Sequence, residues 1–164
     1  MEMTENEKTY SDVARGYLKN VLEYELKQET LEREIEWWKN KAEGCGSVMP
    51  QDKIQTSPQP DKMENAIIKI QEVRDRIGAQ LDECVTFRRN AYLTVEKLEN
   101  AVKRQILYMR YFDFVTKIDK QGEITRTRRM SEVAEMLGYN EEYTRRLHRS
   151  ALIELGEILV KSSK

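Results

Sequence analysis

Apolar residues recur at alternating steps of four and three along residues 10–42. The stripe consists of Tyr10, Ala14, Tyr17, Val21, Tyr24, Leu31, Ile35, Trp38 and Ala42, with Gln28 as its one polar interruption. A seven-residue repeat predicts a long helix with one apolar seam, suited to coiled-coil packing. Ser11 is a candidate N-cap, because its hydroxyl can accept from an unpaired N–H of the first turn. We therefore expect a disordered tail over residues 1–10.

A second periodic segment runs from Asp61 to about Phe112. Its seam reads Met63, Ile67, Ile70, Arg74, Ile77, Leu81, Cys84, Arg88, Ala91, Val95, Leu98, Val102, Gln105 and Met109. Two arginines in the seam indicate that it is partly open or faced by acidic side chains. The pattern leaves open whether residues 62–112 form one helix or two.

The two periodic segments are separated by "GCGSVMPQDKIQTSPQP", which gathers two glycines and all three prolines of the chain. Proline lacks a backbone N–H and clashes with the preceding helical turn, so residues 44–61 are predicted to be a flexible connector. The connector allows the helices to fold into an antiparallel coiled-coil hairpin over residues 11–94. Such a hairpin is also a candidate surface for homo-oligomer formation.

A further pair of helices is predicted near the C-terminal end. After a loop from Phe114 to Arg126, a short helix is expected over residues 128–137, with Thr127 as its cap. Val133, Ala134 and Leu137 would form its buried face, and Gly138 would end it through a left-handed backbone.

The next helix is predicted to begin after Asn140, a suitable cap, with Glu141 and Glu142 at its positive N-terminal end. Its packing face would contain Thr144, Leu147, Ala151 and Leu152. Two helices joined by a tight glycine-containing turn are typical of a helix-turn-helix. We place this domain at residues 95–164.

Composition supports an all-α fold: of 164 residues, 39% are hydrophobic and 35% charged, with seven Gly and three Pro. The formal net charge of -1 hides an asymmetry. Residues 1–61 hold 8 Lys+Arg and 13 Asp+Glu, whereas residues 62–164 hold 20 and 16. An anionic partner would therefore bind the C-terminal part.

Several classes of site are not expected. Cys45 and Cys84 have neither CxxC spacing nor a nearby His, which argues against a metal site and a disulfide framework. Neither a phosphate-cradling glycine loop nor a catalytic constellation is present, so we expect no cofactor and no enzymatic activity. The acidic N-terminus and the lack of a long apolar run predict a cytoplasmic protein that does not associate with a membrane.

The exposed face of the last helix is predicted to read DNA. It carries Glu142, Tyr143, Arg145, Arg146 and Arg149, a composition suited to guanine edges and phosphates in a major groove. Arg126, Arg128 and Arg129 are further candidates, because cations near the start of a helix are disfavoured unless a phosphate binds there. Glu142 could instead serve only as a capping residue, and the basic residues could simply be solvated. His148 is expected to be a packing or phosphate-adjacent residue rather than a catalyst.

Two stretches carry a resemblance to a known family. "YMRYFDF" followed by "MSEVAEMLGYNEEYTRRLHRSALIEL" resembles region 4 of bacterial sigma factors, and the whole chain resembles the ArpU-type late transcriptional regulators of prophages in Gram-positive bacteria. The segment from Phe114 to Arg126 is longer than in the compact members. The resemblance implies a transcriptional regulator that binds double-stranded DNA through Tyr143, Arg145, Arg146 and Arg149, with RNA polymerase core as a candidate partner.

Two other functions fit the same pattern. A small DNA-binding subunit of a phage packaging terminase can also combine a coiled-coil hairpin with a helix-turn-helix, and would assemble as a ring. A coiled-coil adaptor would use its C-terminal domain to bind protein rather than DNA.

Overall fold

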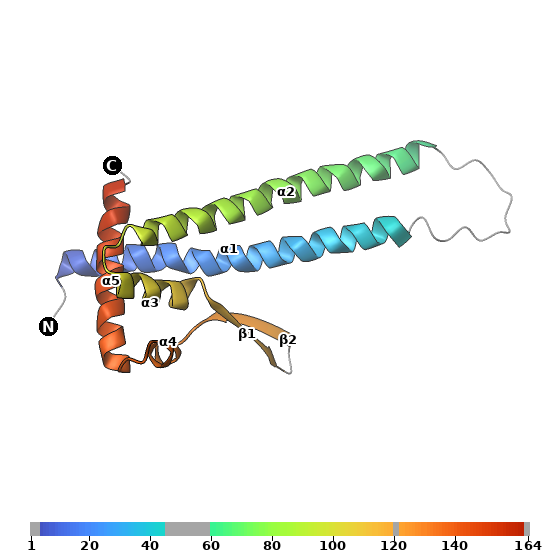
Figure 1. Ribbon diagram of the computed structural model, residues 1–164. Coiled ribbons are helices and arrows are strands. Elements are labelled where there is room, and N and C mark those ends of the chain that lie inside the picture. Colours follow the sequence, from blue (N-terminus) through green and yellow to red (C-terminus); the bar gives the residue numbers. More distant parts are fainter. Residues whose placement is uncertain (1–3, 45–59, 120–121, 163–164) are drawn as a thin grey trace. The chain divides into compact units, whose positions relative to one another are not determined.

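The computed structural model describes residues 4–44, 60–119 and 122–162 (Figure 1). In chain order the elements are α1 (Glu5–Gly44), α2 (Pro60–Glu96), α3 (Ala101–Tyr111), β1 (Phe114–Asp119), β2 (Gly122–Thr127), α4 (Met130–Leu137) and α5 (Glu141–Ser162). The predicted all-α class is confirmed, because five helices make up most of the described chain and the only described strands are β1 and β2. Most of the predicted connector, residues 45–59, lies outside the described residues.

The first helix begins earlier than predicted. Thr4 and Glu7 form a reciprocal cap, in which the Thr4 hydroxyl accepts from the Glu7 N–H (3.3 Å) and the Glu7 carboxylate accepts from the Thr4 N–H (2.8 Å). Ser11 lies inside α1 and is buried, so its assignment as the N-cap is wrong. The prediction of a tail over residues 1–10 is likewise wrong for residues 5–10, which are helical.

The chain divides into two compact units, one formed by residues 1–26 with 86–164 and the other by residues 27–85. This differs from the predicted division at residue 94, since the start of α1 and the end of α2 belong with the C-terminal elements. In the smaller unit the segments of α1 and α2 run antiparallel. Ion pairs join Lys27 to Glu83 (3.2 Å) and Glu34 to Arg76 (3.8 Å), while Ile77 is among the buried residues.

The second predicted seam is confirmed from Ile77 to Leu98, whereas Arg74 is exposed and the side chains of Met63, Ile67 and Ile70 lie outside the described residues. Ile77, Cys84, Ala91, Val95 and Leu98 are buried, and Arg88 is met by a carboxylate, that of Glu25 at 2.6 Å. The helix then ends at Glu96 and a new one starts at Ala101, so residues 62–112 form two helices.

Asn100 is the N-cap of α3, the helix that begins after this break. Its oxygen accepts hydrogen bonds from the N–H groups of Val102 (2.9 Å) and Lys103 (3.2 Å). The helical periodicity of α2 is interrupted at the break, so the buried face of α3 does not continue the predicted seam. The buried residues of α3 are Ile106, Leu107 and Tyr111. The predicted seam residues Val102, Gln105 and Met109 are not buried.

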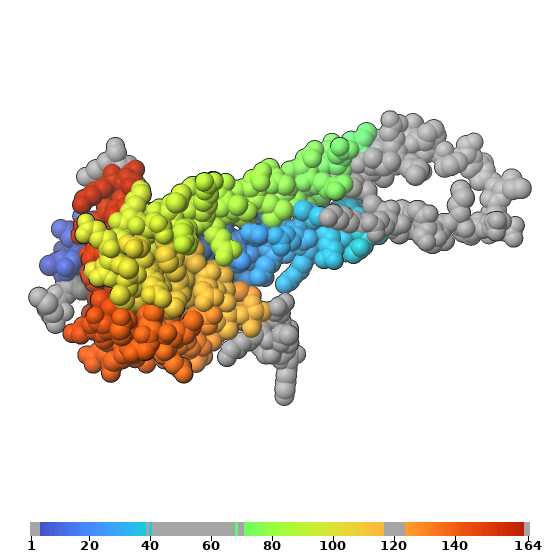
Figure 2. All heavy atoms as spheres, in the orientation of Figure 1, coloured from blue at the N-terminus to red at the C-terminus, as the bar shows by residue number. Residues whose placement is uncertain are grey.

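The core of the larger unit joins elements distant in sequence. It consists of Ala14, Leu18, Val95, Leu98, Leu107, Tyr111, Ala151, Leu152 and Leu155. Helix α1 thus supplies part of the apolar surface on which α3 and α5 pack. On the outside of this unit, α3 (yellow) and α4 with the start of α5 (orange) form adjoining parts of one face in Figure 2.

A β-hairpin occupies the segment that was predicted to be a loop. Strands β1 and β2 pair antiparallel, from Phe114 opposite Thr127 to Asp119 opposite Gly122. The hydroxyls of Thr116 and Thr125, paired across the strands, lie 3.2 Å apart. The loop prediction for residues 114–126 is therefore wrong, and the additional length of this segment is a two-stranded sheet.

Candidate nucleic-acid interface

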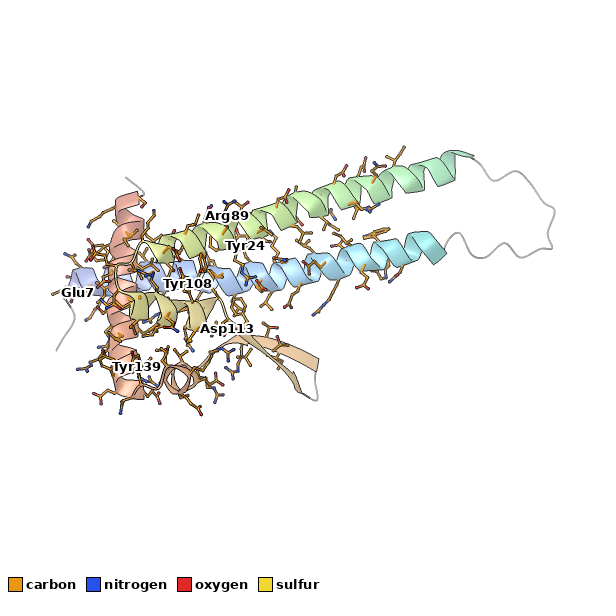
Figure 3. The ribbon with its side chains drawn as sticks, in the orientation of Figure 1. Glu7, Tyr24, Arg89, Tyr108, Asp113 and Tyr139 are labelled. Atoms are coloured by element: carbon orange, nitrogen blue, oxygen red, sulfur yellow. The ribbon has the colours of Figure 1, made fainter. Side chains whose placement is uncertain are left out.

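The turn between α4 and α5 is built as the sequence predicts. Gly138 has a φ of 68°, in the left-handed region that favours glycine. The N–H of Gly138 donates to the Glu135 carbonyl (3.1 Å) and that of Tyr139 to the Ala134 carbonyl (3.0 Å), which satisfies the last carbonyls of α4. Tyr139 is labelled at this turn in Figure 3.

Asn140 starts α5. Its side-chain oxygen accepts from the Glu142 N–H (2.8 Å), and its carbonyl accepts from the Thr144 N–H and hydroxyl, each at 3.0 Å. Glu141 and Glu142 occupy the first turn, where a carboxylate is favoured by the helix dipole. The predicted cap is confirmed, and only three residues separate the two helices.

One face of α5 packs inside the unit and the other is open. Thr144, Ala151 and Leu152 are fully buried and Leu147 is partly buried, as expected for the packing face. On α4 the matching buried residues are Val133 and Ala134. This places two packed helices, α4 and α5, around a short turn, the arrangement that was predicted within the domain at residues 95–164.

The five candidate residues of α5 lie on its exposed side: Glu142, Tyr143, Arg145, Arg146 and Arg149. The Tyr143 side chain is 43% exposed, its ring contacts that of Tyr139 edge-on (5.5 Å), and the Arg146 guanidinium lies 5.5 Å from its centroid. Stacking on an aromatic ring orients the guanidinium without using its N–H donors. Arg145 is instead paired with Glu141 one turn earlier, at 2.5 Å.

The other three candidates lie before α4 rather than in its first turn. Arg126 is on β2 and is held by both oxygens of Glu132 (2.6 and 3.0 Å), while Arg128 binds Asp113 at 2.8 Å, the residue labelled between α3 and β1 in Figure 3. Arg129 is the N-cap position and is exposed, and its N–H donates to Glu132 (2.6 Å).

Two parts of the prediction for this region are therefore wrong. The helix starts at Met130 rather than at residue 128, and Thr127 ends β2 instead of capping α4. The helix-dipole penalty consequently does not apply to Arg128, whose charge Asp113 already balances. The hydrogen bond that the Arg128 guanidinium donates to the Asp113 carboxylate raises the pKa of Arg128 above its ordinary value.

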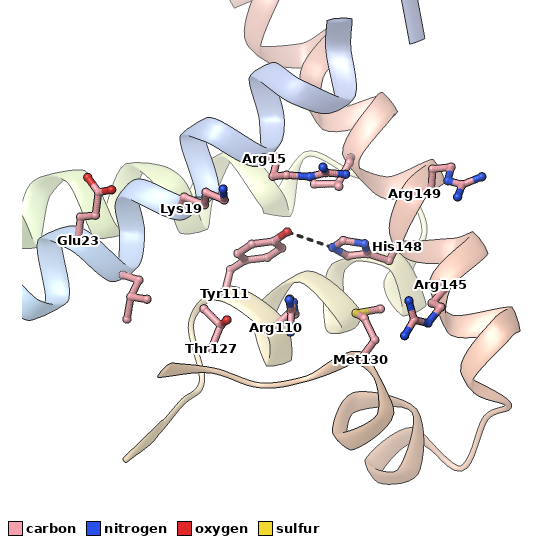
Figure 4. Close-up of a pocket in the computed structure, with 12 residues that line it drawn as sticks. Arg15, Lys19, Glu23, Arg110, Tyr111, Thr127, Met130, Arg145, His148 and Arg149 are labelled. Carbon is pink, nitrogen blue, oxygen red and sulfur yellow. Dashed lines mark hydrogen bonds between the residues drawn. The ribbon is translucent and has the colours of Figure 1, made fainter. Parts of the chain in front are cut away.

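A cavity of about 620 Å³ adjoins the exposed face of α5. Arg145 and Arg149 of α5 line it together with Arg15 and Lys19 of α1 and Arg110 of α3 (Figure 4). Sequence reasoning did not find the last three residues. No local signal marks them, since they join α5 only through the packing of the larger unit.

His148 lies in the wall of this cavity with its imidazole Nε2 3.2 Å from the Tyr111 hydroxyl (Figure 4). The two rings are stacked, with centroids 5.8 Å apart. Burial, followed by the positive charges of Arg110 and Arg15, lowers the pKa of His148 from 6.5 to about 4. The imidazole is therefore neutral at physiological pH, which suits a packing residue.

This pKa predicts a specific loss of stability in acid. The unfolded chain takes up the His148 proton at pH values near 6.5 and the folded chain only near 4. The neutral imidazole therefore makes its full contribution to the free energy of unfolding above pH 6.5, and this contribution is lost as the pH falls from 6.5 through 4. We expect His148→Gln to lose less free energy of unfolding between pH 7 and pH 4 than the wild type does. The difference should be on the order of 3 kcal/mol in denaturant titrations. Equal losses in the two proteins would contradict the assigned pKa.

Among the described residues no group of three or more His, Cys, Asp or Glu side chains is placed to hold a metal ion. No described helix combines the length and apolar character that crossing a bilayer requires. No protein-family model, curated protein or solved structure matches the chain. What the site does is therefore inferred from its residues and their geometry.

Proposed function

We propose that the protein is a sequence-specific DNA-binding transcriptional regulator in which α5 is the recognition helix. The observation that carries this proposal is the division of α5 into a buried packing face and an open face of arginines and one tyrosine. A helix presented in this way, after a short turn from a packed supporting helix, is the arrangement with which helix-turn-helix proteins enter the major groove.

The exposed residues have separate chemical roles in this proposal. Arg146, oriented by the Tyr143 ring, is suited to bidentate hydrogen bonds with a guanine edge. Arg149, one turn further along the same face, is suited to a phosphate, and Glu142 to a cytosine amino group. Arg126 and Arg128, which already bind carboxylates, contribute to DNA binding mainly by holding β2 and the start of α4 in place.

The resemblance to sigma-factor region 4 and to ArpU-type regulators supports a role in prophage late gene control. Under this proposal the DNA site lies in a promoter region, and RNA polymerase core is a candidate second partner.

The test is selection of duplexes from a random-sequence library by the full-length protein, followed by binding measurements on the enriched site. We expect one enriched sequence, and an affinity that falls with salt by a log–log slope of about −0.9 for each phosphate contacted. A scrambled duplex of equal length is the control. Absence of any enriched sequence at moderate salt would rule out this function.

The oligomeric state of the protein distinguishes a transcriptional regulator from the DNA-binding subunit of a packaging terminase. Light scattering on the purified protein should give a monomer or dimer for a regulator, whereas a closed ring of many subunits would favour the terminase subunit. Unchanged mobility of all duplexes, together with capture of RNA polymerase core, would favour the adaptor.

A further inference from the structure

The cavity beside α5 is lined by far more positive than negative side chains. Five of its lining residues are cationic, namely Arg15, Lys19, Arg110, Arg145 and Arg149, and Glu23 is its single carboxylate. Among the described residues, Arg145 alone of the five forms an ion pair, with the half-exposed Glu141, which lies outside the lining. The other four cations therefore form no ion pair with a described carboxylate, and Glu23 offsets only one of their charges.

Two groups at the cavity reflect this excess of positive charge. The Nε of Arg110 is buried without a hydrogen-bond partner in the described structure. A buried guanidinium donor with no acceptor is unusual, because its desolvation is then uncompensated. Beside it, His148 is kept neutral by burial and by the charges of Arg110 and Arg15. An anion in the cavity would offer an acceptor to the Arg110 guanidinium and would offset the part of the His148 shift that comes from the two arginines.

We propose that this cavity is a phosphate-binding site formed jointly by α1, α3 and α5. Arginine N–H groups can bind two oxygens of a phosphate at once, and Lys19 adds a further positive charge to the lining. Figure 4 shows Arg15 and Lys19 on the α1 wall, with Arg110 and Tyr111 on the α3 wall opposite. The volume of about 620 Å³ exceeds that of a phosphate alone, so the site can hold a phosphate that carries further groups.

The phosphate can have two sources. Arg145 and Arg149 belong both to the cavity and to the exposed face of α5, so a backbone phosphate of bound DNA can enter it. A free phosphorylated compound presents the same chemistry. The site itself does not depend on the proposed function, because it can be tested on the free protein.

The first test is a titration of the full-length protein with inorganic phosphate, followed by NMR of the imidazole of its single histidine. We expect saturable binding with a Kd of about 1 mM or tighter, the affinity of two or three charge-assisted hydrogen bonds. Saturation should also raise the pKa of His148 from about 4, because the anion offsets the charges of Arg110 and Arg15, while burial, the larger cause of the low value, stays in place. Absence of saturable binding and an unchanged His148 titration would overturn the proposal.

A pair of variants assigns the binding to this cavity. The double substitution Arg15→Ala/Lys19→Ala removes two exposed lining side chains and should weaken phosphate binding at least tenfold, roughly the effect of one lost charge-assisted contact. Lys8→Ala/Arg89→Ala removes the same charge from exposed positions outside the lining and should leave the Kd within about twofold. Equal weakening by both doubles would indicate nonspecific screening and overturn the assignment.

Competition identifies the source of the phosphate. Displacement of inorganic phosphate by a random-sequence duplex would assign the site to the DNA backbone. Unchanged phosphate binding in the presence of the duplex would assign it to a free phosphorylated compound. Failure of the regulator proposal would appear instead as a lack of sequence enrichment, with phosphate binding intact.

Discussion

Replacing Gly156 with alanine is expected to lower the free energy of unfolding by about 3 kcal/mol, the upper part of the usual range for overpacking. A Cβ built on Gly156 would clash with the backbone oxygen and the carbonyl carbon of Tyr10. These are backbone atoms, so no change of side-chain rotamer relieves the contact. Helices α1 and α5 would have to separate, and the core that they share would open. Urea titration followed by circular dichroism measures the loss.

Two other helical glycines supply matched controls. A Cβ at Gly16 of α1 or at Gly78 of α2 meets nothing within 4 Å. Gly16→Ala and Gly78→Ala should therefore raise the free energy of unfolding by up to about 1 kcal/mol each, because alanine is the better helix former. If Gly156→Ala were as stable as these two variants, the close approach of α1 and α5 at Tyr10 would be wrong.

Arg146→Ala should produce the largest change in DNA recognition. The side chain is exposed and lies over the Tyr143 ring, so its removal should leave the fold intact. Loss of a bidentate base contact costs about 1–3 kcal/mol, which corresponds to a weakening of about 5- to 150-fold at the preferred site. Binding to a scrambled duplex should change far less. Fluorescence anisotropy with both duplexes measures the ratio.

Arg146→Lys and Arg89→Ala test the reason for this effect. Lysine retains the charge and lacks the planar fork, so Arg146→Lys should lose most of the sequence preference. Arg89→Ala removes one charge from an exposed position on α2 and should leave the preference unchanged. Equal weakening of both duplexes by Arg146→Ala would show that Arg146 contacts phosphate and not a base.

Local sequence was sufficient for the boundary between α4 and α5. Gly138 and Asn140 act on their own neighbourhood, through a left-handed backbone and a side-chain cap, so their effect can be predicted without tertiary information. The exposed position of Tyr143, Arg145, Arg146 and Arg149 follows from the same helix, because 3.6 residues per turn places them opposite Thr144 and Ala151.

The β-hairpin had a local signal that the prediction undervalued. Phe114, Val115, Thr116, Thr125 and Thr127 are of residue types favoured in strands, and Gly122 is the first residue of β2. The segment was predicted to be a loop because its polar residues hide the alternation of apolar and polar positions that marks a strand. The partners of Arg126 and Arg128 could not be predicted without the hairpin. Asp113 precedes β1 and Glu132 follows β2, and pairing of the two strands brings these carboxylates to the arginines.

The sequence by itself determined the helical class, the seam of the second long helix between Ile77 and Leu98, and the caps on both sides of the short turn. These features depend on periodicity and on hydrogen bonds that span only a few residues. Tertiary structure alone decided that the start of α1 belongs to the core of α3 and α5, that Gly156 meets Tyr10, and which cations surround the cavity. Residues more than 90 positions apart meet there, and only the packing of complete helices brings them together.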